Sequence, residues 1–271
     1  MLPAVVALMS LGLLFGAGLA FASRVLEVKQ DERIEAIEEL LPGANCGACG
    51  FAGCANFSEA VVHGDVEATA CPVSGPEVLE RLGDILGEDL SLAGSRKVAK
   101  VRCRGHEEAA KNRFSYAGIP DCDAAEAVGG GHKACEYGCL GQGTCVRSCP
   151  FDAMEMSPEG LAVVDEEKCT ACGNCVEACP RDIIEILPED QNVFVMCTAE
   201  LGPRDARKVC DNSCLGCGLC ARRCPQDAIV MKDQLPVIDF DKCDGCGVCI
   251  EACPTDALYG PPERLKDEKT G

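Results

Sequence analysis

The sequence predicts an α+β protein with one N-terminal helix, a small helical module and two tandem copies of a third kind of module. Three observations predict it: an uncharged run at the N-terminus, 24 cysteines gathered in short runs, and a repeat in the second half of the chain. The chain has 271 residues but only 4% aromatic residues and no Trp. Aromatic side chains supply much of the packing energy of ordinary cores, so we expect cysteine chemistry to help hold this chain together.

Residues 1–23 are predicted to form a transmembrane anchor. Residues 2–23 carry no charge and are long enough to cross a bilayer as a helix. Arg24, Lys29 and Arg33 follow, while no Lys or Arg precedes the run, which places the bulk of the chain on the cytoplasmic side of the cell (inner) membrane. A cleaved signal peptide is the alternative, since residues 20–22 (Ala-Phe-Ala) resemble a cleavage site, but the basic leader of such peptides is missing.

The charge and the cysteine spacing exclude two classes of protein. The formal net charge is −19, from 25 basic and 44 acidic residues, and nucleic-acid binding needs clustered Lys and Arg. The cysteines occur in C-x-x-C runs, which suit a shared metal centre better than the disulfide frameworks of small secreted domains. We therefore expect reduced cysteines and no nucleic-acid partner.

Residues 24–90 are predicted to form a helical stalk and a first metal module. Apolar residues recur at helical spacing from Ile34 to Leu41, and Pro42-Gly43 ends the helix.

The first cysteine set is Cys46, Cys49, Cys54 and Cys71, the last followed by Pro72. Four thiolates satisfy one [4Fe–4S] cluster. A structural zinc site would use the same ligands and remains the alternative at this point.

Three later runs share the spacing C-x2-C-x2-C-x3-C-P, which is typical of bacterial ferredoxins. They are Cys169, Cys172, Cys175 and Cys179; Cys214, Cys217, Cys220 and Cys224; and Cys243, Cys246, Cys249 and Cys253. In two-cluster ferredoxins the fourth cysteine of each run binds the other cluster. The crossed sets would then be Cys149 with Cys169, Cys172 and Cys175; Cys253 with Cys214, Cys217 and Cys220; and Cys224 with Cys243, Cys246 and Cys249.

The runs repeat along the chain. Cys139, Cys145 and Cys149 recur at a constant offset as Cys214, Cys220 and Cys224, and the run that starts at Cys169 recurs as the run that starts at Cys243, with an offset shorter by a single position. This predicts two tandem bacterial-ferredoxin-like domains, at 91–187 and 188–262, before a polar tail at 263–271. Each should contain short β-hairpins, such as one over Met154–Val164, and short helices after the cysteine runs.

One run is irregular. It comprises Cys135, Cys139, Cys145 and Cys149, and Gln142 stands where the second repeat has Cys217. Cys139, Cys145 and Cys179 would be one thiolate short of a complete set. We expect Cys135 to fill this place; an incomplete cluster with a free Cys135 is the alternative.

Four cysteines remain, namely Cys103, Cys122, Cys197 and Cys210. They could build a sixth cluster, with two ligands from the lead-in to each repeat. The alternative is that they are buried free thiols, which behave as small apolar side chains. The sequence thus predicts five [4Fe–4S] clusters and leaves a sixth open.

Other chemistry is missing from the sequence. No phosphate-binding G-x-x-x-x-G-K-[ST] motif occurs, and the glycine-rich stretches do not follow the strand-to-helix context of a dinucleotide site. No catalytic constellation stands out either. We expect no nucleotide or flavin site and no catalytic residue on this chain.

The combination of an N-terminal anchor, CGACGFAGC, CEYGCLGQGTCVRSCPFDA and tandem ferredoxin runs resembles the B subunit of the Rnf complex, in its long form with two ferredoxin-like modules. The resemblance implies a membrane-bound, ion-translocating oxidoreductase (a translocase), in which this subunit takes electrons from reduced ferredoxin and passes them to other Rnf subunits. The complex would couple ferredoxin oxidation and NAD reduction to Na⁺ or H⁺ transport.

Two other functions fit the residues alone. One is a polyferredoxin subunit of another membrane oxidoreductase, such as a hydrogenase or a dehydrogenase. The other is a zinc-binding scaffold without redox activity.

Overall fold

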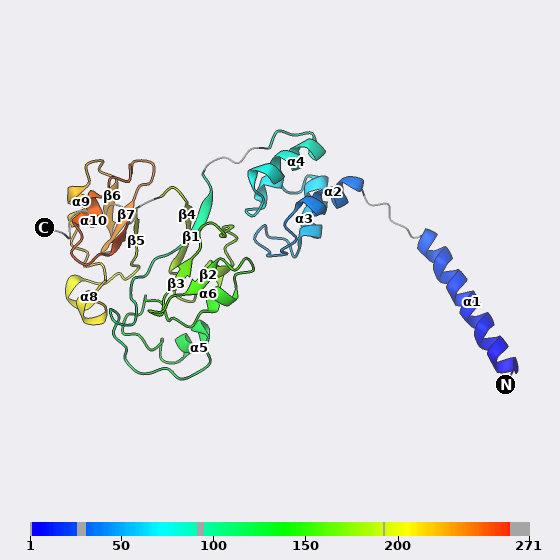
Figure 1. The fold of residues 1–271 in the computed structure, drawn as a ribbon, viewed down its shortest axis with the longest axis horizontal. Coiled ribbons are helices and arrows are strands. Elements are labelled where there is room, and N and C mark those ends of the chain that lie inside the picture. Colours follow the sequence, from blue (N-terminus) through cyan, green and yellow to red (C-terminus); the bar gives the residue numbers. More distant parts are fainter. Residues whose placement is uncertain (1, 26–30, 91–94, 192, 261–271) are drawn as a thin grey trace.

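The computed structural model describes residues 2–25, 31–90, 95–191 and 193–260 (Figure 1). The first element, α1 (Leu2–Val25), is a helix whose large apolar side chains are exposed between Met9 and Phe21. The side chains of residues 1–8, at the start of the predicted anchor, lie outside the described set. Of the part of the chain that is described, no helix combines the length and the apolar character needed to cross a bilayer.

A small helical module follows. Its elements are α2 (Glu32–Leu40), α3 (Cys54–His63), the 3₁₀ helix η1 (Ala68–Ala70) and α4 (Pro76–Leu86). The predicted helix near residues 34–41 is confirmed, and Asp31 caps it by accepting a hydrogen bond from the Arg33 N–H. The most buried side chains are those of Ile37, Phe57, Leu79 and Leu82, which form the core of this module.

The first ferredoxin-like module begins with a strand that precedes its cysteine runs. Its elements in order are β1 (Lys97–Val101), α5 (Cys122–Ala127), α6 (Thr144–Arg147), β2 (Met154–Met156), β3 (Ala162–Val164), α7 (Asn174–Glu177) and β4 (Ile184–Pro188). Strands β2 and β3 pair antiparallel, which confirms the predicted hairpin. Strand β1 pairs antiparallel with β4, so the lead-in joins the end of the module.

The second module repeats this order. It contains β5 (Phe194–Val195), α8 (Pro203–Val209), α9 (Leu219–Arg223), β6 (Ile229–Lys232), β7 (Leu235–Ile238), α10 (Val248–Glu251) and β8 (Leu258–Tyr259). The pairs β5–β8 and β6–β7 correspond to β1–β4 and β2–β3. The short helices α6, α7, α9 and α10 lie within the cysteine runs, around the third cysteine, and not after the runs as predicted.

The two modules pack along a seam formed by both lead-in segments. The Asp211 N–H donates to the carbonyl oxygen of Ala109 at 2.9 Å, and the Lys111 N–H donates to that of Val209 at 2.9 Å. Across the same seam, the Arg102 Nε donates to the Val195 carbonyl oxygen at 3.2 Å. These contacts fix how the second module sits against the first, and they bring Cys103 of the first lead-in close to Cys197 and Cys210 of the second.

Candidate metal centres

Cysteines gather in fours around five pockets of the described structure. Each pocket has an empty volume of about 310 to 390 Å³, which includes space open to solvent. The sets are Cys149, Cys169, Cys172 and Cys175; Cys122, Cys139, Cys145 and Cys179; Cys103, Cys135, Cys197 and Cys210; Cys214, Cys217, Cys220 and Cys253; and Cys224, Cys243, Cys246 and Cys249. With Cys46, Cys49, Cys54 and Cys71 of the helical module, these sets use every cysteine of the chain.

Three of the five sets are those predicted from crossed ligation. In each, three cysteines come from one run, and the fourth comes from the end of the run that lies beside it in the fold. Within a run, a short helix carries the third cysteine, as α7 carries Cys175. The residue before each helix is a glycine with positive φ, such as Gly173 at φ 85°, so the chain can turn sharply around the pocket.

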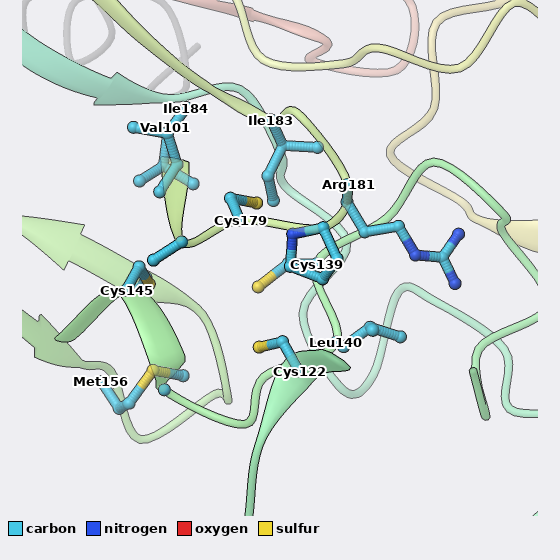
Figure 2. Close-up of a pocket in the computed structure, with 14 residues that line it drawn as sticks. Val101, Cys122, Cys139, Leu140, Cys145, Met156, Cys179, Arg181, Ile183 and Ile184 are labelled. Atoms are coloured by element: carbon cyan, nitrogen blue, oxygen red, sulfur yellow. The ribbon is translucent and has the colours of Figure 1, made fainter. Parts of the chain in front are cut away.

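The pocket of the irregular run differs from the predicted set, because Cys122 and not Cys135 lines it together with Cys139, Cys145 and Cys179. Figure 2 shows the side chains of Cys122, Cys139, Cys145 and Cys179 around one pocket. Cys122 is the first residue of α5, and its N–H donates to the Thr144 Oγ1 at 2.7 Å. Since Thr144 precedes Cys145, this hydrogen bond holds α5 against the pocket.

Cys135 instead lines a pocket at the seam with Cys103, Cys197 and Cys210. Three of the four leftover cysteines proposed for a sixth cluster thus lie together here, and Cys135 takes the place that the prediction gave to Cys122. We call Cys103, Cys135, Cys197 and Cys210 the seam site. Cys103 follows β1, and its equivalent Cys197 follows β5. Cys135 and its equivalent Cys210 each lie four positions before the next cysteine. Each module therefore supplies two equivalent thiols to the seam site.

The sequence did contain a signal for the seam site. The spacing C-x3-C occurs at Cys135–Cys139 and again at Cys210–Cys214. The offset between the two equals that of the recognised repeat, and it pairs Cys135 with Cys210. No comparable signal marks Cys122. It lies in the segment between Cys103 and Cys135, which is much longer than its counterpart between Cys197 and Cys210, so the second module has no equivalent of this cysteine.

Backbone N–H groups point at the cysteine sulfurs. The Cys-Pro-x-Asp sequence occurs four times, and each of its aspartates has φ near 50°: Asp152, Asp182, Asp227 and Asp256. The following N–H then donates to the sulfur of the run's last cysteine, as from Ala153 to Cys149 at 3.4 Å and from Ala257 to Cys253 at 3.3 Å. Such hydrogen bonds stabilise thiolates that carry the charge of a cluster.

The thiols of these pockets are costly to ionise without a cation. Burial raises the pKa of Cys145, Cys175 and Cys249 to about 12, and neighbouring thiols contribute to the rise. Since metal binding requires thiolates, the positive charge of bound iron would compensate for this burial. Among the described residues, no three His, Cys, Asp or Glu side chains lie close enough together to hold a single metal ion. Each pocket is lined by four thiols, and this donor set fits an iron–sulfur cube.

The sites follow one another through the protein. The Cys139 N–H donates to the Cys103 sulfur at 3.4 Å, and the Cys214 N–H donates to the Cys197 sulfur at 3.3 Å, so the seam site touches one set in each module. Elsewhere, thiols of consecutive sets lie close enough for their charges to interact: Cys46 with Cys172, Cys145 with Cys175, and Cys220 with Cys249. The seam site thus occupies the fourth of six positions counted from the helical module.

Three family models match the chain. One described as "Putative Fe-S cluster" covers residues 41–73, a "4Fe-4S binding domain" covers 162–185, and a "4Fe-4S dicluster domain" covers 213–257. These matches include the helical module and both ferredoxin-like modules, and they support [4Fe–4S] binding.

Curated relatives identify the family. The chain is 47% identical over 160 residues to the B subunit of the Na(+)-translocating ferredoxin:NAD(+) oxidoreductase complex of Acetobacterium woodii, covering 58% of this chain and 47% of that protein. It is 37% identical to the B subunit of the ion-translocating oxidoreductase complex of Methanosarcina acetivorans, over 62% of this chain and 64% of the relative. The chain thus spans about half to two thirds of the length of these relatives. With the corresponding subunit of Aliivibrio fischeri it shares 33% identity over 61% of this chain and 71% of that protein. The chain belongs to the family of B subunits of ion-translocating oxidoreductase complexes.

Proposed function

We propose that this chain is the electron-transfer subunit of an Rnf-type complex that couples ferredoxin oxidation and NAD reduction to the translocation of Na⁺ or H⁺. The observation that carries the proposal is the gathering of 20 cysteines into five four-thiol pockets, arranged in sequence from the helical module to the C-terminal module. The name of one relative supports the donor and the acceptor, since the Acetobacterium woodii protein is named as a subunit of a ferredoxin:NAD(+) oxidoreductase complex.

We assign one [4Fe–4S] cluster to each of the five pockets and a sixth to Cys46, Cys49, Cys54 and Cys71. When bound, such clusters supply one-electron redox chemistry. The chain's own residues line each pocket and direct N–H groups at cysteine sulfurs. In the helical module, Asn45 has φ 47° and its side-chain oxygen accepts a hydrogen bond from the Cys54 N–H at 2.9 Å, which shapes the loop that carries Cys46 and Cys49.

Iron analysis of cysteine variants tests these sets. The anaerobically prepared chain should contain about 24 iron and 24 sulfide, from six cubes of four. Cys103→Ala and Cys135→Ala should each lose about four iron, and the double variant should lose the same four, because both residues belong to one site. Cys122→Ala with Cys135→Ala should lose about eight. Unchanged iron in Cys122→Ala, or a loss of about eight in Cys103→Ala with Cys135→Ala, would contradict the assignment.

We further propose that residues 1–23 anchor the chain in the membrane as a single pass, with the other four predicted segments on the cytoplasmic side. The uncharged sequence and the exposed apolar side chains of α1 support this proposal. The polar tail at 263–271 lies outside the described residues.

One purification tests both the anchor and the complex. An affinity-tagged chain should stay with membranes washed in alkaline carbonate, and after detergent extraction it should bring with it a flavoprotein and membrane subunits that reduce NAD with reduced ferredoxin. Recovery with a nickel subunit would instead favour the hydrogenase alternative. Release by carbonate would contradict the anchor alone.

A further inference from the structure

Cys217 differs from the other cysteines of the chain in its exposure. It is the only one of the 24 that is exposed to solvent. It lines its pocket with Leu219 and Pro254, and Pro254 is also exposed. The set that contains Cys217 therefore has one solvent-exposed thiol, whereas the cysteines of every other set are buried or partly buried.

Two arginines adjoin this exposed thiol. Arg222 lies on α9, and its Nη2 donates to the Cys217 carbonyl oxygen at 3.0 Å, which holds a positive charge beside the loop. Arg223 is exposed next to it, and among the described residues neither arginine forms an ion pair with a carboxylate. We call Cys217, Leu219, Arg222, Arg223 and Pro254 the Cys217 face.

The equivalent helices of the other three sets lack this free positive charge. Between the third and fourth cysteines, the run at Cys214 has Ala-Arg-Arg, whereas the others have Val-Arg-Ser, Val-Glu-Ala and Ile-Glu-Ala. Arg147 of the Val-Arg-Ser helix is paired with Asp121 at 3.3 Å. Glu177 and Glu251 place a negative charge at the corresponding point of α7 and α10.

We propose that the electron donor, a small acidic iron–sulfur protein, docks on the Cys217 face; the proposal rests on reduced ferredoxin being the donor. A chain with net charge −19 repels an acidic partner over most of its surface, so an unpaired arginine pair beside an exposed thiol steers the partner to this point. Arginine flanked by apolar residues is also typical of the strongest contacts in protein interfaces.

Charge reversal tests the docking face. Arg222→Glu with Arg223→Glu changes the net charge by −4, and Arg204→Glu with Arg207→Glu on α8 is the matched control, since it makes the same change at exposed sites in the same module. Each variant is compared with the unaltered, iron-loaded chain in two measurements. The first is the second-order rate at which a reduced acidic two-cluster ferredoxin bleaches the clusters of the chain, and the second is the affinity for the oxidised ferredoxin, measured by calorimetry. At low salt we expect the Arg222/Arg223 variant to lose roughly tenfold or more in both, with the loss shrinking as salt rises.

A second variant separates docking from damage to the pocket. Arg223→Glu alone leaves the contact of Arg222 with the Cys217 loop in place, and it should keep full iron while still weakening ferredoxin binding several-fold. Equal losses in the α8 control, or unchanged binding in both Cys217-face variants, would overturn the docking proposal while leaving the proposed function intact. If ferredoxin fails to reduce even the unaltered chain, the proposed function itself fails.

Discussion

Replacing Cys197 with alanine should separate the clusters of the chain into two groups that no longer exchange electrons rapidly. The seam site is the only set in the described structure with thiols from both modules, and its Cys103 and Cys197 sulfurs accept N–H groups from Cys139 and Cys214. After mixing with reduced ferredoxin, two of the five remaining clusters should bleach rapidly if the donor docks on the Cys217 face. In the unaltered chain, bleaching should extend to all six.

The same experiment reports the side from which electrons enter. Docking on the first module would make three of the five remaining clusters bleach rapidly. Cys46→Ala is the control, because it should also lose about four iron but removes an end of the series, so the other five clusters should still respond together. Rapid bleaching of all five clusters in Cys197→Ala would show that the seam site is not needed for transfer between the modules.

Removal of iron should unfold both ferredoxin-like modules. Their sheets have two strands each, all of them short, and such small sheets are marginal on their own. Structural metal sites in zinc-finger peptides contribute about 10–16 kcal/mol, which is as large as the total stability of about 5–15 kcal/mol of an ordinary domain. A chelator used with an oxidant should therefore abolish cooperative thermal unfolding of these modules.

Hydrogen exchange locates this effect along the chain. Amides of β1, β4, β6 and β7 should lose their protection when iron is removed. Those of α4 should retain more, because Leu79 and Leu82 pack with Phe57 in a core whose only buried cysteine is Cys71. Persistent protection of β1 and β4 in the iron-free chain would show that Val98, Ile184 and their neighbours stabilise the first module without a metal.

Regular spacing made most of the fold predictable. Three cysteines in one C-x2-C-x2-C run can reach one pocket through a short loop and a single helical turn, so the local sequence determines their grouping. The hairpin between Met154 and Val164 and the helix that begins at Glu32 were predictable for the same reason, since each depends on neighbouring residues.

The fourth ligand of an irregular set depends on contacts between distant segments. Cys122 reaches its pocket because Asp121 caps α5 by accepting the Ala124 N–H, and because Thr144 accepts the Cys122 N–H. The cap by Asp121 is local, but the hydrogen bond from Cys122 to Thr144 joins residues 22 positions apart, and no spacing in a single sequence reveals it. The prediction for Cys135 differs from the observed pocket because it looks for a thiolate to replace the one missing at Gln142 and does not use the equivalence of Cys135 and Cys210 in the repeat.

Because the seam site takes two cysteines from each module, its assembly depends on the order in which the modules are synthesised. Its first two thiols, Cys103 and Cys135, leave the ribosome well before Cys197 and Cys210, and half a ligand set cannot retain a cube. A cluster can therefore be completed here only after Cys210 has been synthesised and the second module has packed against the first. A truncated translation product would carry the first repeat with its own centres but would lack the connection to the second.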